Sequence, residues 1–424
     1  DRLVREGVRL TDFYVTWPAC TPSRGSLLTG RYPQRNGLYD MIRNDVADLG
    51  VRIPPDEYAV SPERILGMDP REIMIAQVLR DAGYATAVFG KWDGGQLRRF
   101  LPLQRGFDEF YGFVNTGIDY YTHERYGAPS MYRGNEPTTE DRGTYCTDLF
   151  RREALRFVRE NREGPFFLYL PFNAPHGASN LDPQIRGAAQ APEEYKRLYL
   201  HLKDDYVPGR TYGRESLVPS RDKRRLEYMA SVTSMDDAIG AVLDLLDELK
   251  LADDTLVVFF SDNGGGGGAD NAPLRGGKAQ LFEGGVRVPF VARYPGRIPA
   301  GQVSSEFLTS LELFPTIARL VGAELPGNVV HDGFDMLPVL AGEQSSPRTE
   351  MFWERRDNRA ARVGNYKWVE SARGSGLFDL SSDIGERHDL SKDKPDVLAE
   401  LKSRFAGWKA EMEAAEPRGP FRDY

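Results

Sequence analysis

The stretch REIMIAQVLRDAGYATAVFGKW, residues 71–92, shows how this chain is organised. Apolar side chains recur at helical spacing up to Leu79, and Gly83 then interrupts the pattern. A short apolar run follows over residues 85–90 and ends in polar residues 91–93. This order predicts a helix, a glycine turn and a buried strand.

The same pattern recurs twice along the chain. Residues 147–176 predict a helix and a strand near 166–172, and residues 224–264 predict a helix and a strand over 255–261. Apolar strands between helices indicate an α/β fold whose mostly parallel sheet is buried on both faces. Ligands of such sheets bind at the carboxyl ends of the strands. Polar residues stand at these ends, at 91–93, 173–176 and 262–263.

The pattern changes after about residue 342. A polar connector, EQSSPRTE, is followed by the short segments MFWER, AARVGNYKWVES and GLFDL, and by a helical stretch over 395–415. Short segments separated by turn residues predict a small antiparallel sheet, here with one covering helix. We therefore expect an α/β domain over 1–343 and a smaller antiparallel-sheet domain over 344–424.

Charge and composition exclude several classes of function. The 424 residues carry 55 basic and 63 acidic side chains, a net charge of −8, so no general basic field attracts nucleic acid or anionic membrane. No apolar run is long enough to span a bilayer. With two cysteines, Cys20 and Cys146, the chain is not a disulfide scaffold. An anionic substrate would therefore have to bind a local cluster of cations.

Cys20 stands in an unusual setting, ACTPSRGSLLTGRYP, residues 19–33. On this stretch alone it could be a buried thiol, half of a disulfide, or a nucleophile with a histidine base from elsewhere in the fold. Residues 20–30 match the signature C-x-P-S-R-x-x-L-L-T-G of the type I sulfatases. Further segments resemble that family in the same order: GKW, RGFDEFYGF, PFNAPH, SDNGG, NAPLRGGKAQLFEGGVRVPF, ELFPTIARLVGA and DGFDMLPVL.

The chain thus resembles the formylglycine-dependent sulfatases of the alkaline phosphatase-like superfamily. The overall pattern looks closest to the arylsulfatases and the glycosaminoglycan-type carbohydrate sulfatases. The resemblance implies a large, mostly parallel sheet between helices, with a smaller C-terminal antiparallel-sheet subdomain. It also implies a sulfate monoester as substrate, carried by a sugar such as a hexosamine.

The resemblance assigns catalytic roles to five residues. A maturation enzyme would oxidise Cys20 to formylglycine, and the aldehyde hydrate would attack sulfur and later expel sulfate. Arg24 would hold the hydrate, Lys91 and Lys278 would bind sulfate, and His176 would contact the bridging oxygen and could protonate the leaving alcohol. Without the resemblance, Arg24 could be a surface ion pair, either lysine a solvated side chain, and the histidine a structural residue.

The resemblance also implies a divalent metal. Asp262, Asn263 and the formylglycine from Cys20 would be ligands of Ca²⁺, with Mg²⁺ as the alternative, because both ions prefer oxygen ligands. The plain alternative for the Asp-Asn pair is a turn. Family members carry two further acidic ligands on a first strand, which is absent here, although calcium takes about 6 to 8 oxygens. We therefore expect an N-terminally truncated chain that fails to turn over a sulfate ester.

Asp93 is a second departure, because the family usually reads G-K-W-H. A carboxylate beside bound sulfate is repulsive unless it is paired, protonated or turned to the sugar. We expect Asp93 either to accept hydrogen bonds from sugar hydroxyls or to pair with a basic neighbour such as Arg98 or Arg99. We also expect His123, with Tyr120 and Tyr121, to line a sugar pocket, while Phe107 and Phe110 pack in the core.

The leading hypothesis is a sulfatase that hydrolyses a sulfate monoester of a carbohydrate. One alternative is a phosphonate monoester or phosphodiester hydrolase of the same superfamily, since such relatives share C-x-P-S-R. Another is a degenerate protein that binds sulfated glycan without cleaving it. Because the family is usually exported, we expect a periplasmic or secreted bacterial protein whose export signal would precede residue 1.

Overall fold

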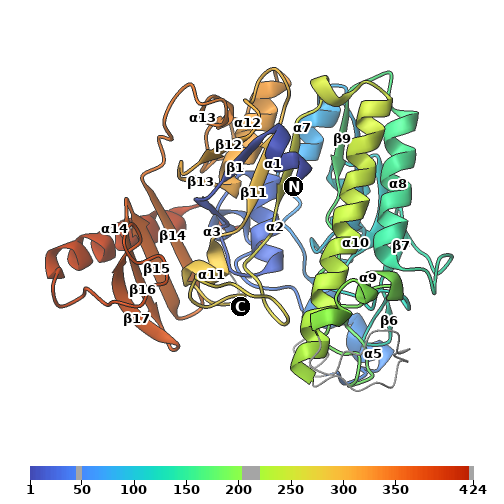
Figure 1. The fold of residues 1–424 in the computed structure, drawn as a ribbon, viewed down its shortest axis with the longest axis horizontal. Helices are drawn as coiled ribbons and strands as arrows, with labels where there is room; N and C mark the ends of the chain where they lie inside the picture. The colour runs from blue at the N-terminus through green and yellow to red at the C-terminus, as the bar shows by residue number, and fades with distance from the viewer. Residues whose placement is uncertain (44–49, 203–219, 420–424) are drawn as a thin grey trace.

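Two β-sheets form the centre of the molecule (Figure 1). The computed structural model describes residues 1–43, 50–202 and 220–419. The five-stranded sheet has the order β8 (Glu136–Pro137), β7 (Met131–Arg133), β4 (Glu109–Phe113), β3 (Ala85–Lys91) and β9 (Phe166–Tyr169). The four-stranded sheet has the order β10 (Val257–Phe260), β11 (Phe290–Arg293), β1 (Val8–Leu10) and β12 (Gln302–Ser304).

The three strands predicted from the sequence are present as β3, β9 and β10. Strand β3 pairs in parallel with both β4 and β9, as expected. Strand β11 instead runs antiparallel to both β10 and β1, and β7 runs antiparallel to β4. The α/β fold is confirmed. Its strands form two sheets, because β9 and β10 do not pair with each other, and each sheet contains both parallel and antiparallel pairs.

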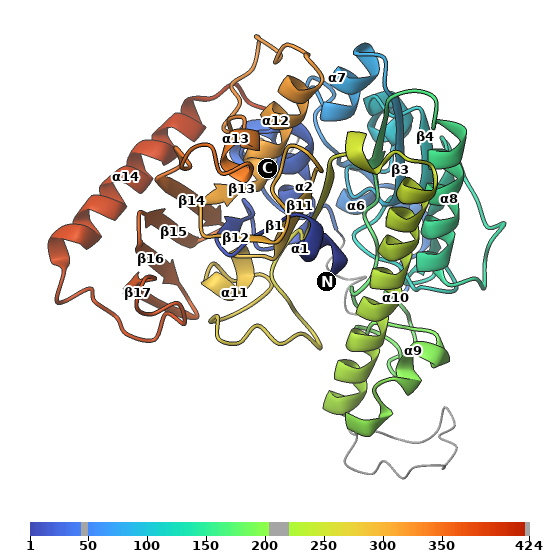
Figure 2. The same cartoon turned by 45° about the horizontal axis from the view of Figure 1, so that its top comes forward.

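Helices cover both faces of the five-stranded sheet. On one face, Ala87 and Phe89 of β3 pack against α8 (Cys146–Glu160), where the rings of Phe89 and Phe157 lie 5.9 Å apart. The opposite face packs Val88 against α2 (Cys20–Thr29), α7 (Ile75–Asp81) and α12 (Leu313–Leu320). The long helix α10 (Ser220–Glu248) lies beside α8 in both views (Figures 1 and 2). This alternation follows from the period-2 geometry of a strand.

An apolar cavity of about 990 Å³ separates β9 from β10. Among residues 1–43, 50–202 and 220–419, β9 pairs only with β3 and β10 only with β11, and both strands line the cavity. Leu243 and Leu246 of α10 line it as well, as do Leu28 of α2 and Phe314 of α12. The two sheets therefore lie on opposite sides of this cavity, and the edges of β9 and β10 that face it are not paired with another described strand.

The predicted C-terminal antiparallel sheet is confirmed. Strands β14 (Glu350–Arg355), β15 (Asn358–Val363), β16 (Tyr366–Ser371) and β17 (Gly374–Asp379) pair in sequence order, and α14 (Pro395–Ala414) covers them. Figure 1 shows this subdomain on the side of the molecule away from α8 and α10. The boundary at 343/344 stays a prediction.

Two reciprocal hydrogen bonds join β14 to the segment that precedes α2. The Trp17 indole donates to the Glu354 carbonyl at 3.0 Å, and the Trp353 indole donates to the Val15 carbonyl at 2.8 Å. Both indoles are fully buried. The smaller sheet is thus attached within three residues of Cys20.

Shorter elements complete the described chain. The helices are α1 (Arg2–Glu6), α3 (Pro33–Asn36), α5 (Pro55–Ala59), α6 (Pro62–Ile65), α9 (Glu193–Arg197), α11 (Glu283–Val286) and α13 (Leu337–Leu340). The strands are β2 (Phe13–Tyr14), β5 (Glu124–Arg125), β6 (Ala128–Pro129) and β13 (Leu308–Thr309), and 3-10 turns span Arg98–Phe100, Pro102–Arg105, Leu200–Leu202, Ala252–Asp254 and Ser310–Glu312. No helix in the described ranges combines the length and apolarity that crossing a membrane requires.

Candidate functional site

Cys20 is the first residue of α2. The preceding Ala19 is extended, and Gly30 ends the helix in the left-handed conformation. Cys20 and Cys146 are both buried free thiols, so no disulfide joins them. At the start of a ten-residue helix, the unpaired backbone N–H groups and the helix dipole favour negative charge. Cys20 therefore lies where an oxyanion would be stabilised.

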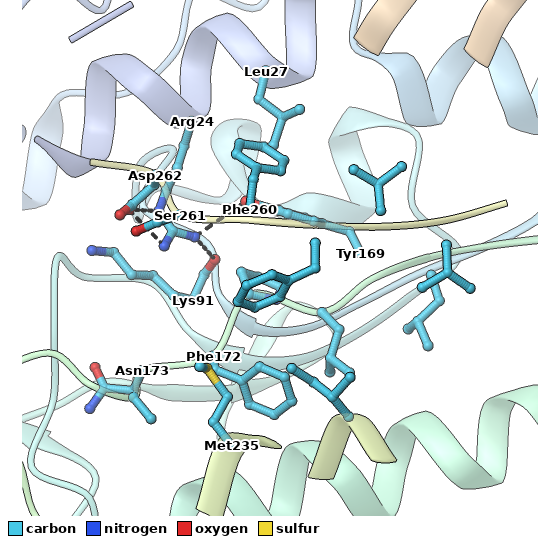
Figure 3. A pocket seen from close by; sticks show the side chains of 18 of the residues that line it. Arg24, Leu27, Lys91, Tyr169, Phe172, Asn173, Met235, Phe260, Ser261 and Asp262 are labelled. Carbon is cyan, nitrogen blue, oxygen red and sulfur yellow. Dashed lines mark hydrogen bonds and ion pairs between the residues drawn. The ribbon is translucent and has the colours of Figure 1, made fainter. Parts of the chain in front are cut away.

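The carboxyl ends of β3, β9 and β10 meet the start of α2 at one end of the cavity, as the sequence predicted. Figure 3 shows Arg24, Lys91, Asn173 and Asp262 converging there. The polar side chains that line this end are Cys20, Arg24, Lys91, Asn173, His176, Asp262, Asn263 and Lys278. The structure thus brings together the predicted catalytic and metal-binding residues from five separate parts of the sequence.

Lys278 and Asn263 lie next to the Cys20 thiol. The Lys278 Nζ atom is 3.5 Å from Cys20 Sγ, and Asn263 Oδ1 is 3.7 Å from the same sulfur. Burial disfavours the Lys278 ammonium, but the charges of Cys20 and Asp262 outweigh burial and raise the pKa of Lys278. This lysine is therefore a permanent cation beside residue 20.

Arg24 and Asp262 form an ion pair at the site (Figure 3). Arg24 Nε and Nη2 each lie 2.8 Å from Asp262 Oδ2, and Nη1 donates to the Tyr169 hydroxyl at 3.2 Å. Burial disfavours the Asp262 carboxylate, but Arg24, Lys91 and Lys278 outweigh burial and lower its pKa. Arg24 is therefore a largely buried site residue, with its side chain 11% exposed, and the surface ion pair considered for it does not form.

Lys91 is buried between two acceptors. Its Nζ donates to the Thr116 carbonyl at 2.5 Å and lies 3.3 Å from Asp93 Oδ2. The other oxygen of Asp93 accepts from the Thr21 hydroxyl at 3.0 Å. Asp93 thus pairs with a basic neighbour, as expected, but the partner is Lys91 and not Arg98 or Arg99. Its side chain is 1% exposed and is not part of the cavity lining, so the geometry does not support a contact with sugar hydroxyls.

His176 presents a defined tautomer to the cavity. Its Nδ1 lies 2.8 Å from the Gly177 carbonyl, which can only accept, so Nδ1 carries the proton. Burial and the positive charges of Lys278 and Lys91 hold the pKa of His176 well below its usual range. The free protein therefore holds a neutral imidazole whose Nε2 is unprotonated.

The described residues supply few metal ligands. Asp262 and Asn263 offer oxygen ligands beside Cys20, but the carboxylate of Asp262 is paired with Arg24. No group of three or more His, Cys, Asp or Glu side chains within 1–43, 50–202 and 220–419 could hold a metal ion. These residues alone do not complete a calcium site, which takes about 6 to 8 oxygens.

The predicted sugar-pocket residues lie elsewhere. His123 is 5% exposed, and its Nε2 lies 2.9 Å from the Thr144 carbonyl. Tyr120 stacks on Tyr145 in the core, and neither Tyr121 nor His123 lines the cavity. The prediction that Phe107 and Phe110 pack in the core is confirmed. The aromatic cluster thus contacts the site only indirectly. The Tyr120 hydroxyl donates a hydrogen bond to the backbone carbonyl of His176 at 2.8 Å and so helps to hold that residue in place.

No role is predicted from the sequence for Tyr169, and Asn173 is noted there only as a polar residue at a strand end. Tyr169 is on an apolar strand and gave no signal, although its hydroxyl contacts Arg24. Asn173 follows β9 directly, within the PFNAPH segment, so its position at a strand end was a usable signal. Its Oδ1 atom is buried without a hydrogen-bond partner among the described residues, and its side chain lines the pocket.

Known proteins share this architecture and sequence. A model of the Sulfatase family matches residues 1–323, and one described as N-sulphoglucosamine sulphohydrolase, C-terminal, matches residues 277–411. The chain is 31% identical to N-acetylgalactosamine-6-sulfatase of Canis lupus familiaris over 92% of this chain and 76% of that protein. It is 32% identical to arylsulfatase A of Homo sapiens over 99% of this chain and 84% of that protein.

Solved structures agree. The crystal structure of Ps i-CgsB superposes with a TM-score of 0.80 at 29% identity, covering 96% of this chain and 86% of that one. A second structure of Ps i-CgsB, in complex with k-i-k-neocarrahexaose, gives a TM-score of 0.79. With the cation cluster around Cys20, these matches show that the chain belongs to the sulfatase family of sulfuric ester hydrolases.

Proposed function

We propose that this protein hydrolyses a sulfate monoester of a carbohydrate, with a formylglycine made from Cys20 as its nucleophile. The observation that carries the proposal is the position of Cys20: Lys278 lies 3.5 Å from its sulfur, and Arg24 and Lys91 line the same end of the cavity. Preorganised cations in a water-poor site stabilise the charge that develops on sulfate oxygens.

The side chains present suit distinct steps. When Cys20 is oxidised by a maturation enzyme, the aldehyde hydrate supplies the attacking oxygen. Lys91 and Lys278 would bind sulfate oxygens, and Arg24 would hold the substituent of residue 20 against the start of α2. His176 Nε2, once protonated, would deliver a proton to the leaving alcohol. Since the described ligands do not complete a metal site, no step is assigned to a divalent cation.

A sugar as the alcohol part is supported by the relatives. One is named for a 6-sulfated N-acetylgalactosamine, and Ps i-CgsB was solved with a neocarrahexaose. The cavity also opens beside polar groups and the glycine-rich residues 264–268, which leave room for a bulky substrate. Export to the periplasm or out of the cell is part of the same proposal and rests on the family resemblance.

The test combines mass spectrometry with turnover. Protein produced with the maturation enzyme should carry formylglycine at residue 20, about 18 Da lighter than cysteine. The matured protein should then hydrolyse nitrophenyl sulfate faster than nitrophenyl phosphonate and act on defined sulfated saccharides. An unmodified thiol under these conditions would favour a glycan-binding protein, and a preference for the phosphonate would favour the phosphonate hydrolase.

A further inference from the structure

A buried charged cluster connects the C-terminal sheet to the loop that carries Lys278. Lys367 of β16 lies 2.7 Å from Glu283 Oε1 and 3.0 Å from Glu386 Oε1, and all three side chains are 0% exposed. Glu283 opens α11, five residues after Lys278. Burying two carboxylates around one ammonium is costly unless every group is paired. Such a cluster needs an explanation beyond stability.

Glu386 contacts both ends of the loop. Its Oε2 accepts the Glu283 backbone N–H at 2.7 Å, and its backbone carbonyl accepts from Arg275 Nη1 at 2.8 Å. Arg275 precedes Lys278 by three residues and Glu283 follows it by five, so one residue holds the loop on both sides. Arg275 also lies over the Phe282 ring, 3.9 Å from its centre.

The middle of the loop is held by the site itself. The Lys278 N–H donates to the Gly265 carbonyl at 3.0 Å, and the Ala279 N–H donates to the Pro18 carbonyl at 2.8 Å. Ala279 adopts a φ of 69°, a left-handed conformation that a residue other than glycine would seldom keep in a free loop. The anchors at both ends therefore keep a strained turn in place, and Lys278 Nζ at Cys20.

We propose that Glu386 is a positioning residue that fixes Lys278 against residue 20, so that the C-terminal sheet sets the geometry of the catalytic cation. The functional meaning of this inference rests on the proposed role of Lys278 in sulfate binding. The two contacts of Glu386 join residues 103 and 111 positions apart in the chain. The smaller sheet thereby becomes part of the active site without contacting substrate.

Lysine acetylation followed by mass spectrometry tests the proposal without turnover. Glu386→Ala removes the bond to the Glu283 N–H and should raise the acetylation rate of Lys278 about tenfold, while Lys91 is unchanged. Glu386→Gln retains an amide oxygen for that N–H and should stay within about twofold of the parent. Arg275→Met releases the other end, leaves no buried charge unpaired, and should raise the Lys278 rate severalfold.

Arg348→Met is the matched control. Arg348 Nε lies 2.8 Å from Glu312, a buried pair that also joins the C-terminal segment to the larger domain but does not touch the Lys278 loop. This variant should leave the Lys278 rate at the parent value. Equal rates in folded Glu386→Ala and the parent would overturn the proposal, as would equal increases at Lys91 or in Arg348→Met. If Glu386→Ala does not fold, a parental Lys278 rate in Arg275→Met overturns it.

Inorganic sulfate separates this inference from the proposed function. Saturating sulfate should protect Lys278 from acetylation in the parent. If sulfate gives no protection but Glu386→Ala still accelerates acetylation, the role of Lys278 in sulfate binding fails while the positioning by Glu386 stands. If sulfate protects Lys278 but the Glu386 and Arg275 variants keep the parental acetylation rate, Lys278 binds sulfate and the positioning by Glu386 is wrong.

Discussion

At the scale of single residues, the site is a balance of buried charges. Arg24, Lys91 and Lys278 contribute three cations, and Asp93 and Asp262 contribute two carboxylates. Asp93 adopts a φ of 58°, a conformation that costs a residue other than glycine about 1–3 kcal/mol. The contacts to Lys91 and Thr21 offset that cost, and they join the end of β3 to the first turn of α2.

Asp93→Asn should make the site bind sulfate more tightly. The amide can still accept from the Thr21 hydroxyl, but the net positive charge around residue 20 rises by one. We expect the dissociation constant of inorganic sulfate, measured by calorimetry, to fall by about threefold to tenfold. Thr21→Val keeps the carboxylate and should leave the affinity near the parent value. An unchanged affinity in Asp93→Asn would show that its charge is not felt at the sulfate site.

His176 should take up a proton when sulfate binds. Its pKa lies well below the usual 6.5 in the free protein, so it is neutral at pH 6, and a bound anion beside Lys91 and Lys278 would raise that pKa. Binding should therefore consume protons at pH 6 but not at pH 8. Calorimetry in buffers of different ionisation enthalpy measures this uptake. His176→Gln should abolish it, and zero uptake by the parent at pH 6 would contradict the assignment.

At the scale of elements, the sequence predicted the individual helices and strands better than it predicted which of them pair or contact each other. The strands at 85–90, 166–172 and 255–261 were predicted because apolar runs between helices are a local signal. That β9 and β10 do not pair with each other depends on the arrangement of all the strands, and no local sequence signal predicts it. The Lys91 to Asp93 pair and the anchor at Glu386 were also beyond prediction, because they depend on side-chain direction and on contacts between distant residues.

Hydrogen exchange should reveal the unpaired edges of β9 and β10. Their backbone groups that face the cavity have no strand partner, whereas β3 is paired on both sides by β4 and β9. We expect amides within 166–169 and 257–260 to exchange at least about tenfold faster than those of 86–90. The β3 peptide is the internal control. Equal protection in all three strands would mean that the cavity is closed in solution.

At the scale of the whole molecule, the fold assembles a cation cluster more completely than a metal site. The described residues offer Asp262 and Asn263 as oxygen ligands. We therefore expect residues 1–424 alone to bind Ca²⁺ with a dissociation constant no tighter than about 1 mM, and to turn over nitrophenyl sulfate poorly. Tight Ca²⁺ binding with metal-dependent turnover would show that the ligands in these residues suffice.

The hydrogen bonds of the Trp17 and Trp353 indoles limit how much of the C-terminal sheet can be removed from the protein. A fragment ending at residue 343 would retain every predicted site residue, yet the Trp17 indole and the Val15 carbonyl would lose the partners that β14 provides. Each lost hydrogen bond costs about 0.5–1.5 kcal/mol, the Trp17 ring would also be exposed to water, and both losses would fall on the segment that leads directly into Cys20. We therefore expect that a shortened protein without the smaller sheet would hold Cys20 less firmly in place.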